Sequence, residues 1–151
     1  MREPFSLHVA DVQKRITAFV IDDIVVSIFF FIIFYDQIKT KFLGISVIDV
    51  QVLENFNTFV AENMIVIFAI KVLYHTVLVW QSGMTLGKYI VKIKVVDLQS
   101  GNIPSFGRSL IRALLRIPSE LFLYTGFALA FFTPLRQTFH DKLSNCVVID
   151  A

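Results

Sequence analysis

The sequence predicts an all-α membrane protein with two transmembrane helices, a re-entrant or third short helical segment and a small cytoplasmic pair of β-strands. Three observations predict this class. Of the 151 residues, 56% are hydrophobic and 16 are Phe, which suits helices that face lipid. Two apolar stretches, 16–35 and 64–82, are long enough to cross a bilayer core of roughly 30 Å. A third stretch, 110–134, is too charged at its start to be a simple span.

The length and composition limit what else the chain can be. With 151 residues there is room for a single membrane domain, 1–151. Cys146 is the only cysteine, which excludes an internal disulfide and a cysteine-rich metal site, so we expect no metal and no cofactor. We expect Cys146 to be a small apolar residue in a strand. The formal net charge of +2 gives no reason to expect a nucleic-acid partner.

The first apolar stretch contains two adjacent carboxylates, Asp22 and Asp23. Its Leu, Ile, Phe and Val residues, at about 0.3–0.6 kcal/mol each, favour insertion by roughly 7 kcal/mol in total, whereas two central aspartates cost about 6 kcal/mol. The stretch should therefore insert. Because ionisable groups inside a membrane are functional candidates, both aspartates are candidates for binding an ion or a proton.

The second stretch is a marginal span on its own. Lys71 costs about 3 kcal/mol, while the apolar residues of 64–82 contribute roughly 4–5 kcal/mol. Gly83 is expected to end this helix. The region between the spans, 36–63, is polar and is the least basic part of the chain. Its pattern fits either a strand near 45–53 or a short interfacial helix.

Two short strand signals lie in the second half of the chain. Residues 92–96 alternate Lys with Ile and Val, and a Ser-Gly-Asn turn follows them. Residues 146–149 are a second such run. We expect the two to pair as a small sheet at the membrane surface.

Four residues recur at every fourth position and so share one face of a helix: Arg108, Arg112, Arg116 and Glu120. Pro118 should disturb that helix near its third turn. Two interpretations stay open. Either the arginines grip anionic lipid headgroups, or Arg112 and Arg116 are counter-ions of the intramembrane aspartates. The apolar run that follows forms a re-entrant hairpin or a full third span.

The distribution of basic residues predicts the topology. They cluster outside 36–63, so the positive-inside bias places both termini in the cytoplasm. At 1.5 Å per residue, Asp22 then lies about 10 Å into the membrane, and the second span returns to that depth at His75. A polar cluster is predicted at this depth, containing Asp22, Asp23, His75 and Lys71, with Arg15 and Arg112 at its boundary. The cluster is either an ion site or a charge pair that only joins two marginal helices.

Short motifs extend through nearly the whole chain outside 36–63. They are Arg15 with Asp22 seven residues on, Gly83-x-Thr85-Leu86-Gly87-Lys88 followed by Ile93-Lys94-Val95-Val96-Asp97, Arg108-x-x-x-Arg112, and Pro134-Leu135-Arg136-Gln137-Thr138-Phe139-His140-Asp141-Lys142-Leu143. In this order and spacing they resemble the RDD family of small bacterial membrane proteins. The family's name records an arginine and two aspartates, which match Arg15, Asp22 and Asp141. Asp23, Lys71 and His75 lie outside that pattern.

The resemblance implies a location in the cytoplasmic membrane and a role in transport of unidentified solutes, with sodium–proton exchange suggested for some members. We therefore expect a multi-pass inner-membrane protein that moves or exchanges cations, protons or a small solute. In this hypothesis Asp22, with Asp23, binds the ion. Arg15 and His75 tune that site, and Asp141 orients Arg15 or Arg112.

Two helices cannot enclose a pathway, so transport requires a homo-oligomer or a membrane partner protein. The alternative is a non-transporting accessory protein whose charges are structural and whose basic face binds anionic lipid or a membrane complex. We expect no enzyme, because His140 and Asp141 form a dyad with no nucleophile beside it. No residue is predicted to be catalytic.

Overall fold

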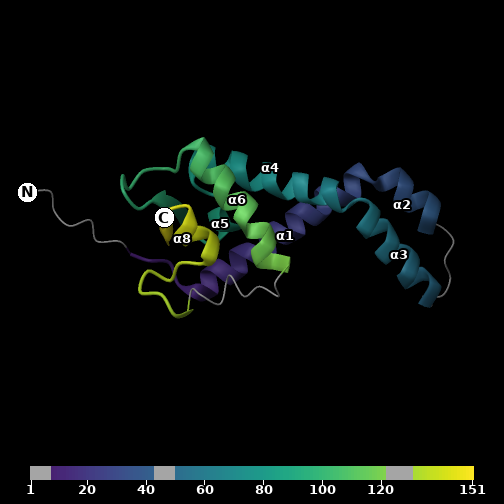
Figure 1. The fold of residues 1–151 in the computed structure, drawn as a ribbon, viewed down its shortest axis with the longest axis horizontal. Coiled ribbons are helices and arrows are strands. Elements are labelled where there is room, and N and C mark those ends of the chain that lie inside the picture. The colour runs from purple at the N-terminus through teal and green to yellow at the C-terminus, as the bar shows by residue number, and fades with distance from the viewer. Residues whose placement is uncertain (1–7, 43–49, 122–130) are drawn as a thin grey trace, which may run out of the picture.

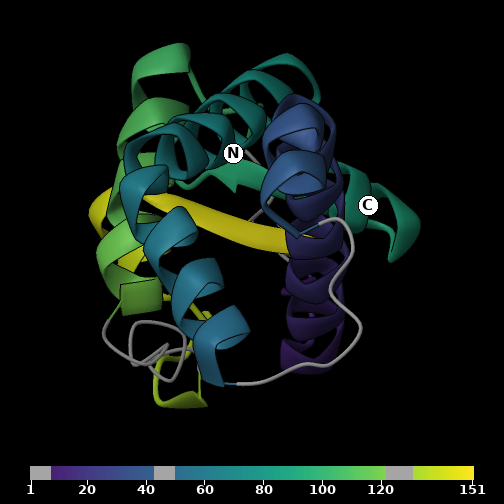
Figure 2. The same cartoon turned by 90° about the vertical axis from the view of Figure 1, so that its right-hand side faces the viewer.

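The computed structural model describes residues 8–42, 50–121 and 131–151 (Figure 1). Two long helices run through the molecule, α1 (Val12–Ile33) and α4 (Met64–Ser82). At one end, five shorter elements surround them and form what we call the head: α5 (Leu86–Ile90), β1 (Ile93–Asp97), α6 (Phe106–Leu121), α8 (Phe139–Leu143) and β2 (Cys146–Asp150). Seen from the opposite end, α1 lies to one side and α6 to the other, with β2 crossing between them (Figure 2).

The region between the two long helices is helical wherever the structure describes it. Helix α2 (Tyr35–Phe42) follows α1, and α3 (Val50–Glu62) precedes α4. The helical hydrogen bonding continues across both joints, because Phe34 and Asn63 each accept from the backbone N–H four residues on, at 2.9 and 3.1 Å. A strand in 50–53 is therefore wrong, and the rest of the strand alternative, 45–49, lies outside the described residues.

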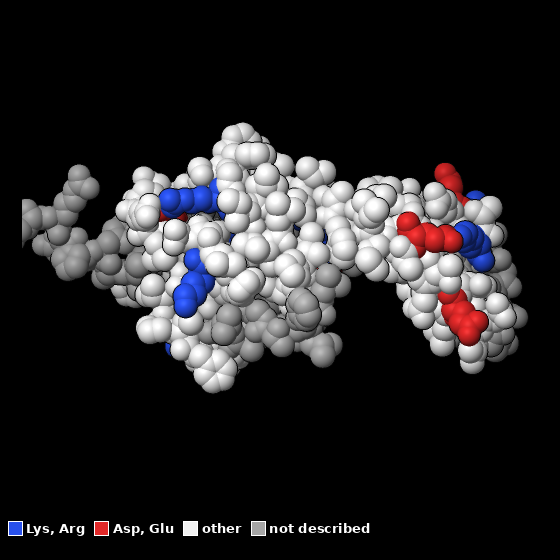
Figure 3. All heavy atoms as spheres, in the orientation of Figure 1, with Lys and Arg blue, Asp and Glu red and all other residues white. Residues whose placement is uncertain are grey.

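The surfaces of α1 and α4 explain why the sequence is so apolar. Helix α1 buries a single stripe, namely Arg15, Ala18, Asp22, Val26 and Phe30, and most of its other side chains face outward. Exposed apolar residues include Ile32 and, on α4, Ile65 and Leu73. Both helices are long and apolar enough to cross a membrane. In Figure 3 an uncharged band separates basic residues on the head from the charged α2–α3 end.

The predicted strand pair is confirmed. Strands β1 and β2 are antiparallel, with Ile93 opposite Asp150 and Asp97 opposite Cys146. Residues 8–10 lie along the other edge of β2, where Ala10 donates to the Val148 carbonyl at 3.0 Å. The exposed edge of a two-stranded sheet offers unpaired backbone groups, and the N-terminal segment satisfies some of them.

Helix α6 continues through Pro118 to Leu121, so the proline does not end the helix. An ion pair between Arg116 and Glu120, with Nε to Oε1 at 2.7 Å, joins the turns on either side of it. The predicted re-entrant or third segment, 110–134, contains the second half of this helix. Its centre, 122–130, lies outside the described residues.

Two glycines fix how the head meets the long helices. Gly83 ends α4 in a left-handed conformation, with φ of 73°, as expected, and its carbonyl accepts from the Val95 N–H at 2.8 Å. Gly87 lies where α5 packs against α1. A Cβ atom at this position would lie 2.2 Å from the Ala18 carbonyl oxygen and 2.9 Å from Asp22 Oδ1. Only glycine permits this approach without displacing backbone.

Gly87→Ala should therefore lower the free energy of unfolding by about 1–3 kcal/mol, because the added methyl overpacks the α1–α5 contact. Gly107→Ala is the matched control, since nothing lies within 4 Å of a Cβ there. On α6 it should be neutral or stabilising by up to about 1 kcal/mol. Thermal unfolding in detergent, followed by circular dichroism, measures both. Equal effects of the two substitutions would show that the close approach at Gly87 is unimportant.

Candidate functional site

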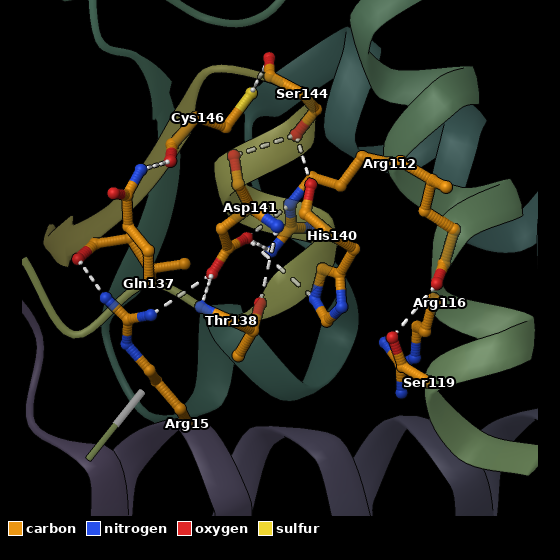
Figure 4. A network of polar contacts seen from close by, with 12 residues as sticks. Arg15, Arg112, Arg116, Ser119, Gln137, Thr138, His140, Asp141, Ser144 and Cys146 are labelled. Atoms are coloured by element: carbon orange, nitrogen blue, oxygen red, sulfur yellow. Dashed lines mark hydrogen bonds and ion pairs between the residues drawn. The ribbon is translucent and has the colours of Figure 1, made fainter. Parts of the chain in front are cut away.

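Asp141 is the centre of a buried ion-pair network in the head (Figure 4). Its carboxylate is 1% exposed and binds two guanidinium groups from different helices. Arg112 on α6 donates to Oδ1 from Nε at 2.8 Å and from Nη2 at 2.6 Å, and Arg15 on α1 donates to Oδ2 at 3.2 Å. The resemblance to the RDD family associated Arg15 with Asp141, and the structure brings them together.

The local sequence explains how Asp141 is positioned. Thr138 caps α8, accepting from the Asp141 N–H, while the Asp141 carboxylate accepts from the Thr138 N–H at 3.3 Å. This capping box fixes the carboxylate at the start of the helix. Arg15 also donates to the backbone carbonyls of Arg136 at 2.6 Å and Val148 at 2.9 Å. One arginine therefore joins α1 to the segment before α8 and to β2.

Asp22 forms a second buried site on the same stripe of α1. It is fully buried and accepts three hydrogen bonds: from the Thr85 hydroxyl at 2.6 Å, the Tyr74 hydroxyl at 2.8 Å and the Gly87 N–H at 2.9 Å. The Lys88 ammonium lies 3.6 Å from Oδ2 and donates to Thr85. The carboxylate is thus surrounded by donors of the protein itself.

Lys71 is the centre of a third site. Its ammonium lies 2.7 Å from Glu120 on α6 and 3.2 Å from Asp23 on α1. The side chains are 13–29% exposed, so this site is more open than those of Asp22 and Asp141. Arg116 pairs with Glu120 as well, and its Nη1 lies 3.3 Å from Nδ1 of His75. Three helices, α1, α4 and α6, meet through these charges.

The estimate of depth from the sequence predicted the contact between Lys71 and Asp23, but it assigned the wrong residue of α4 to Asp22. Lys71 does contact Asp23, as predicted. Asp22, however, bonds to Tyr74, whereas His75 faces Arg116. Adjacent residues of a helix point about 100° apart, so an estimate of depth alone cannot choose between positions 74 and 75.

The arginine stripe of α6 turns inward. Arg112 and Arg116 are buried and pair with Asp141 and Glu120, respectively. Neither guanidinium is therefore placed to bind a lipid headgroup. Neither is the direct counter-ion of Asp22 or Asp23. Burial of a guanidinium requires a paired carboxylate, and both find one within the head. Arg108 is partly exposed; it pairs with Asp97 and donates to Gln99.

Besides Tyr74, three partners of Asp22 and one of Lys71 escaped the sequence analysis. Thr85, Gly87 and Lys88 stood in a motif quoted for the family resemblance, but nothing in their spacing indicated that they bind Asp22. Glu120 was seen only as a member of the arginine stripe. A Thr followed three residues later by an acidic residue, as in Thr138 to Asp141, is the signal that could have predicted the capping box.

The close packing of buried charged groups in the head shifts the pKa values of several of them. Burial opposes ionisation of Asp141, but the charged guanidiniums of Arg112 and Arg15 outweigh it and hold the pKa of this carboxyl well below its usual range. Burial lowers the pKa of Lys88 to about 7, against the attraction of Asp22. Burial likewise holds the pKa of His140 well below its usual value, which keeps the imidazole neutral.

Two helices that are long and apolar enough to cross a membrane are typical of an integral membrane protein. The model of the RDD family matches residues 9–145, and the chain belongs to this family, as its motifs indicated. It is 31% identical over 67 residues to a proline-rich antigen homolog of Mycobacterium tuberculosis, covering 44% of this chain and 28% of that protein. It is 31% identical over 101 residues to an uncharacterized protein of Rickettsia prowazekii, covering 64% of this chain and 56% of that one. No solved structure matches the chain.

Asp141→Asn should lower the free energy of unfolding by about 3–5 kcal/mol, because it leaves the guanidiniums of Arg15 and Arg112 buried without their counter-charge. Asp150→Asn is the control. Its ion pair with Lys14 is solvent-exposed, so the loss should be under about 1 kcal/mol. Thermal unfolding in detergent compares the two, and similar small losses would contradict a central role for Asp141.

Lys88 should make stability depend on pH. Its pKa is about 7 in the folded protein and near 10.5 when unfolded, so between these values the unfolded state binds more protons and stability rises with pH, by up to about 1.4 kcal/mol per unit. Denaturation midpoints between about pH 7 and pH 10 measure this slope. Lys88→Met should flatten it, whereas Lys142→Met, at an exposed position, should not. An unchanged slope in Lys88→Met would contradict the assignment.

Proposed function

We propose that this RDD-family protein exchanges cations for protons across the bacterial inner membrane, acting as an oligomer. The observation that carries the proposal is the Lys71 site. One ammonium is shared by two carboxylates, Asp23 and Glu120, at 3.2 and 2.7 Å, on helices that reach into the apolar part of the molecule. Ionisable groups at such depth are costly and are typical of ion and proton pathways.

The exchange follows from charge balance at this site. A monovalent cation that replaces the Lys71 ammonium between Asp23 and Glu120 leaves the net charge of the site unchanged if Lys71 releases one proton. Cation entry is then coupled to proton release at the same carboxylates. We assign the ion-binding role to Asp23 and Glu120 rather than to Asp22, because three hydrogen-bond donors and Lys88 already surround Asp22.

The proposed topology has two full spans, α1 and α4, with both termini in the cytoplasm and the head at the cytoplasmic side of the membrane. Basic side chains gather on the head, whereas acidic ones dominate the α2–α3 end in the face that Figure 3 shows, which agrees with the positive-inside bias. Two spans cannot enclose a pathway, so α1 and α4 of several copies, or of a partner protein, must complete it.

Reconstitution into proteoliposomes that contain a pH-sensitive dye tests the proposal. An imposed sodium or potassium gradient should drive proton flux. Asp23→Asn and Glu120→Gln should each reduce the initial rate at least about tenfold, the expected loss when one of two ligands of a charged species is neutralised. Asp36→Asn, at an exposed position on α2, should retain the flux. Circular dichroism and gel filtration confirm that each variant is folded and has the same oligomeric state.

The second candidate is a non-transporting accessory protein whose buried charges are structural and whose head binds anionic lipid or a membrane complex. The accessory role is favoured by the hydrogen bonds that the Asp22 and Asp141 carboxylates already accept from groups of the protein itself. Exposed basic residues of the head, such as Lys14, Lys92 and Lys142, supply the binding face. Absence of flux from a folded oligomer would support this role and contradict exchange. Under both hypotheses we propose no enzymatic activity.

A further inference from the structure

A small cavity lies inside the head, between α1, α5, α6, α8 and the sheet. Its volume is about 30 Å³. Among the residues that the structure describes, the cavity is lined by one carboxylate, Asp141, and by four cationic side chains, Arg15, Lys88, Arg112 and Arg116. Apolar side chains, among them Ile93 and Val148, form other parts of the wall. The cavity is not lined by Lys71, Asp23 or Glu120, and Arg116 is the residue that it shares with the Lys71 site.

The charges around this cavity do not balance. Arg15 and Arg112 share the single carboxylate of Asp141. Lys88 is paired with Asp22, while Lys71 and Arg116 are together balanced by two carboxylates of their own site. Within 8–42, 50–121 and 131–151, the network thus carries one positive charge more than its carboxylates neutralise. Arg15 Nε is also buried there without a hydrogen-bond acceptor.

We propose that this cavity binds one small monovalent anion of halide size, such as chloride, as the missing counter-ion of Arg15, Arg112 and Lys88. An unmatched charge removed from water costs several kcal/mol, and an anion between these cations offsets that cost. The cavity is large enough for such an ion, because a water needs roughly 10–15 Å³ and the volume here is about 30 Å³.

Anion binding is linked to protonation of Lys88. The charged groups around this ammonium are Asp22 on α1, Asp141 on α8, and Arg112 and Arg116 on α6, and the imidazoles of His75 and His140 lie within its field. Burial lowers the pKa of Lys88 to about 7 despite the pull of Asp22. A bound anion favours the protonated amine, so the site should bind chloride more tightly below about pH 7 than above it.

Thermal unfolding of the full chain in detergent tests the proposal, with chloride replaced by gluconate at constant ionic strength so that screening does not change. Chloride and bromide should raise the unfolding midpoint by a few degrees relative to gluconate, and more at about pH 6 than at about pH 9. Excess line width in chloride NMR, removed by bromide, should report the same site.

Lys88→Met should abolish the chloride response, because it removes the surplus charge and leaves Asp22 three other donors. Lys142→Met makes the same change at an exposed position and should keep the response. Val148→Leu enlarges a side chain that lines the cavity without altering charge, so it should weaken the chloride response. This variant keeps the proposal testable if Lys88→Met does not fold.

Three results would overturn the proposal. The first is an equal unfolding midpoint in chloride and gluconate for the unmodified protein. The second is a chloride response that Lys88→Met retains. The third is stabilisation by inorganic phosphate or by phosphatidylglycerol vesicles in place of chloride, which would assign the cavity to an oxyanion. This test does not measure proton flux in proteoliposomes. The anion site and the proposed exchange activity are therefore tested independently of each other.

Discussion

The interaction on which the head depends is the sharing of one carboxylate, Asp141, by Arg15 and Arg112. Removing three charged groups from water is unfavourable unless each is matched closely, and here the matching groups come from α1, α6 and α8. Because Arg15 also bonds to the carbonyls of Arg136 and Val148, this carboxylate fixes the start of α1 against the sheet. The positions of the other two ion-pair sites follow from that placement.

Helix α1 presents opposite charges on one face. Arg15 and Asp22 are two turns apart on its buried stripe, and each finds its partner in a different part of the head: Asp141 for the cation, and Thr85, Gly87 and Lys88 for the carboxylate. Two such anchors prevent rotation of the helix about its own axis. An apolar helix in lipid has no hydrophobic force to fix that rotation, so polar contacts must do it.

The sequence was sufficient for what depends on periodicity and length. The bounds of α4, the pairing of 146–149 with 92–96 and the end of α4 at Gly83 all follow from local patterns. The contacts among the buried charged groups could be predicted only in part. Depth arithmetic found Lys71 with Asp23, but choosing Tyr74 over His75 needs the rotation of α4, which is set by α6 packing against it. No local signal shows that the α6 arginines face inward, because their carboxylate partners lie on other elements or beyond Pro118.

The charge pairing also bears on how the chain enters the membrane. Alone, 64–82 is marginal because Lys71 costs about 3 kcal/mol. Once α1 is in place, Asp23 lies 3.2 Å from that ammonium, so each helix supplies the counter-charge that the other needs. Either span alone exposes an unpaired charge to hydrocarbon, whereas the pair of helices exposes a neutral contact. Stable insertion of α4 therefore depends on α1, and Glu120, from the later helix α6, completes the site only after both are in place.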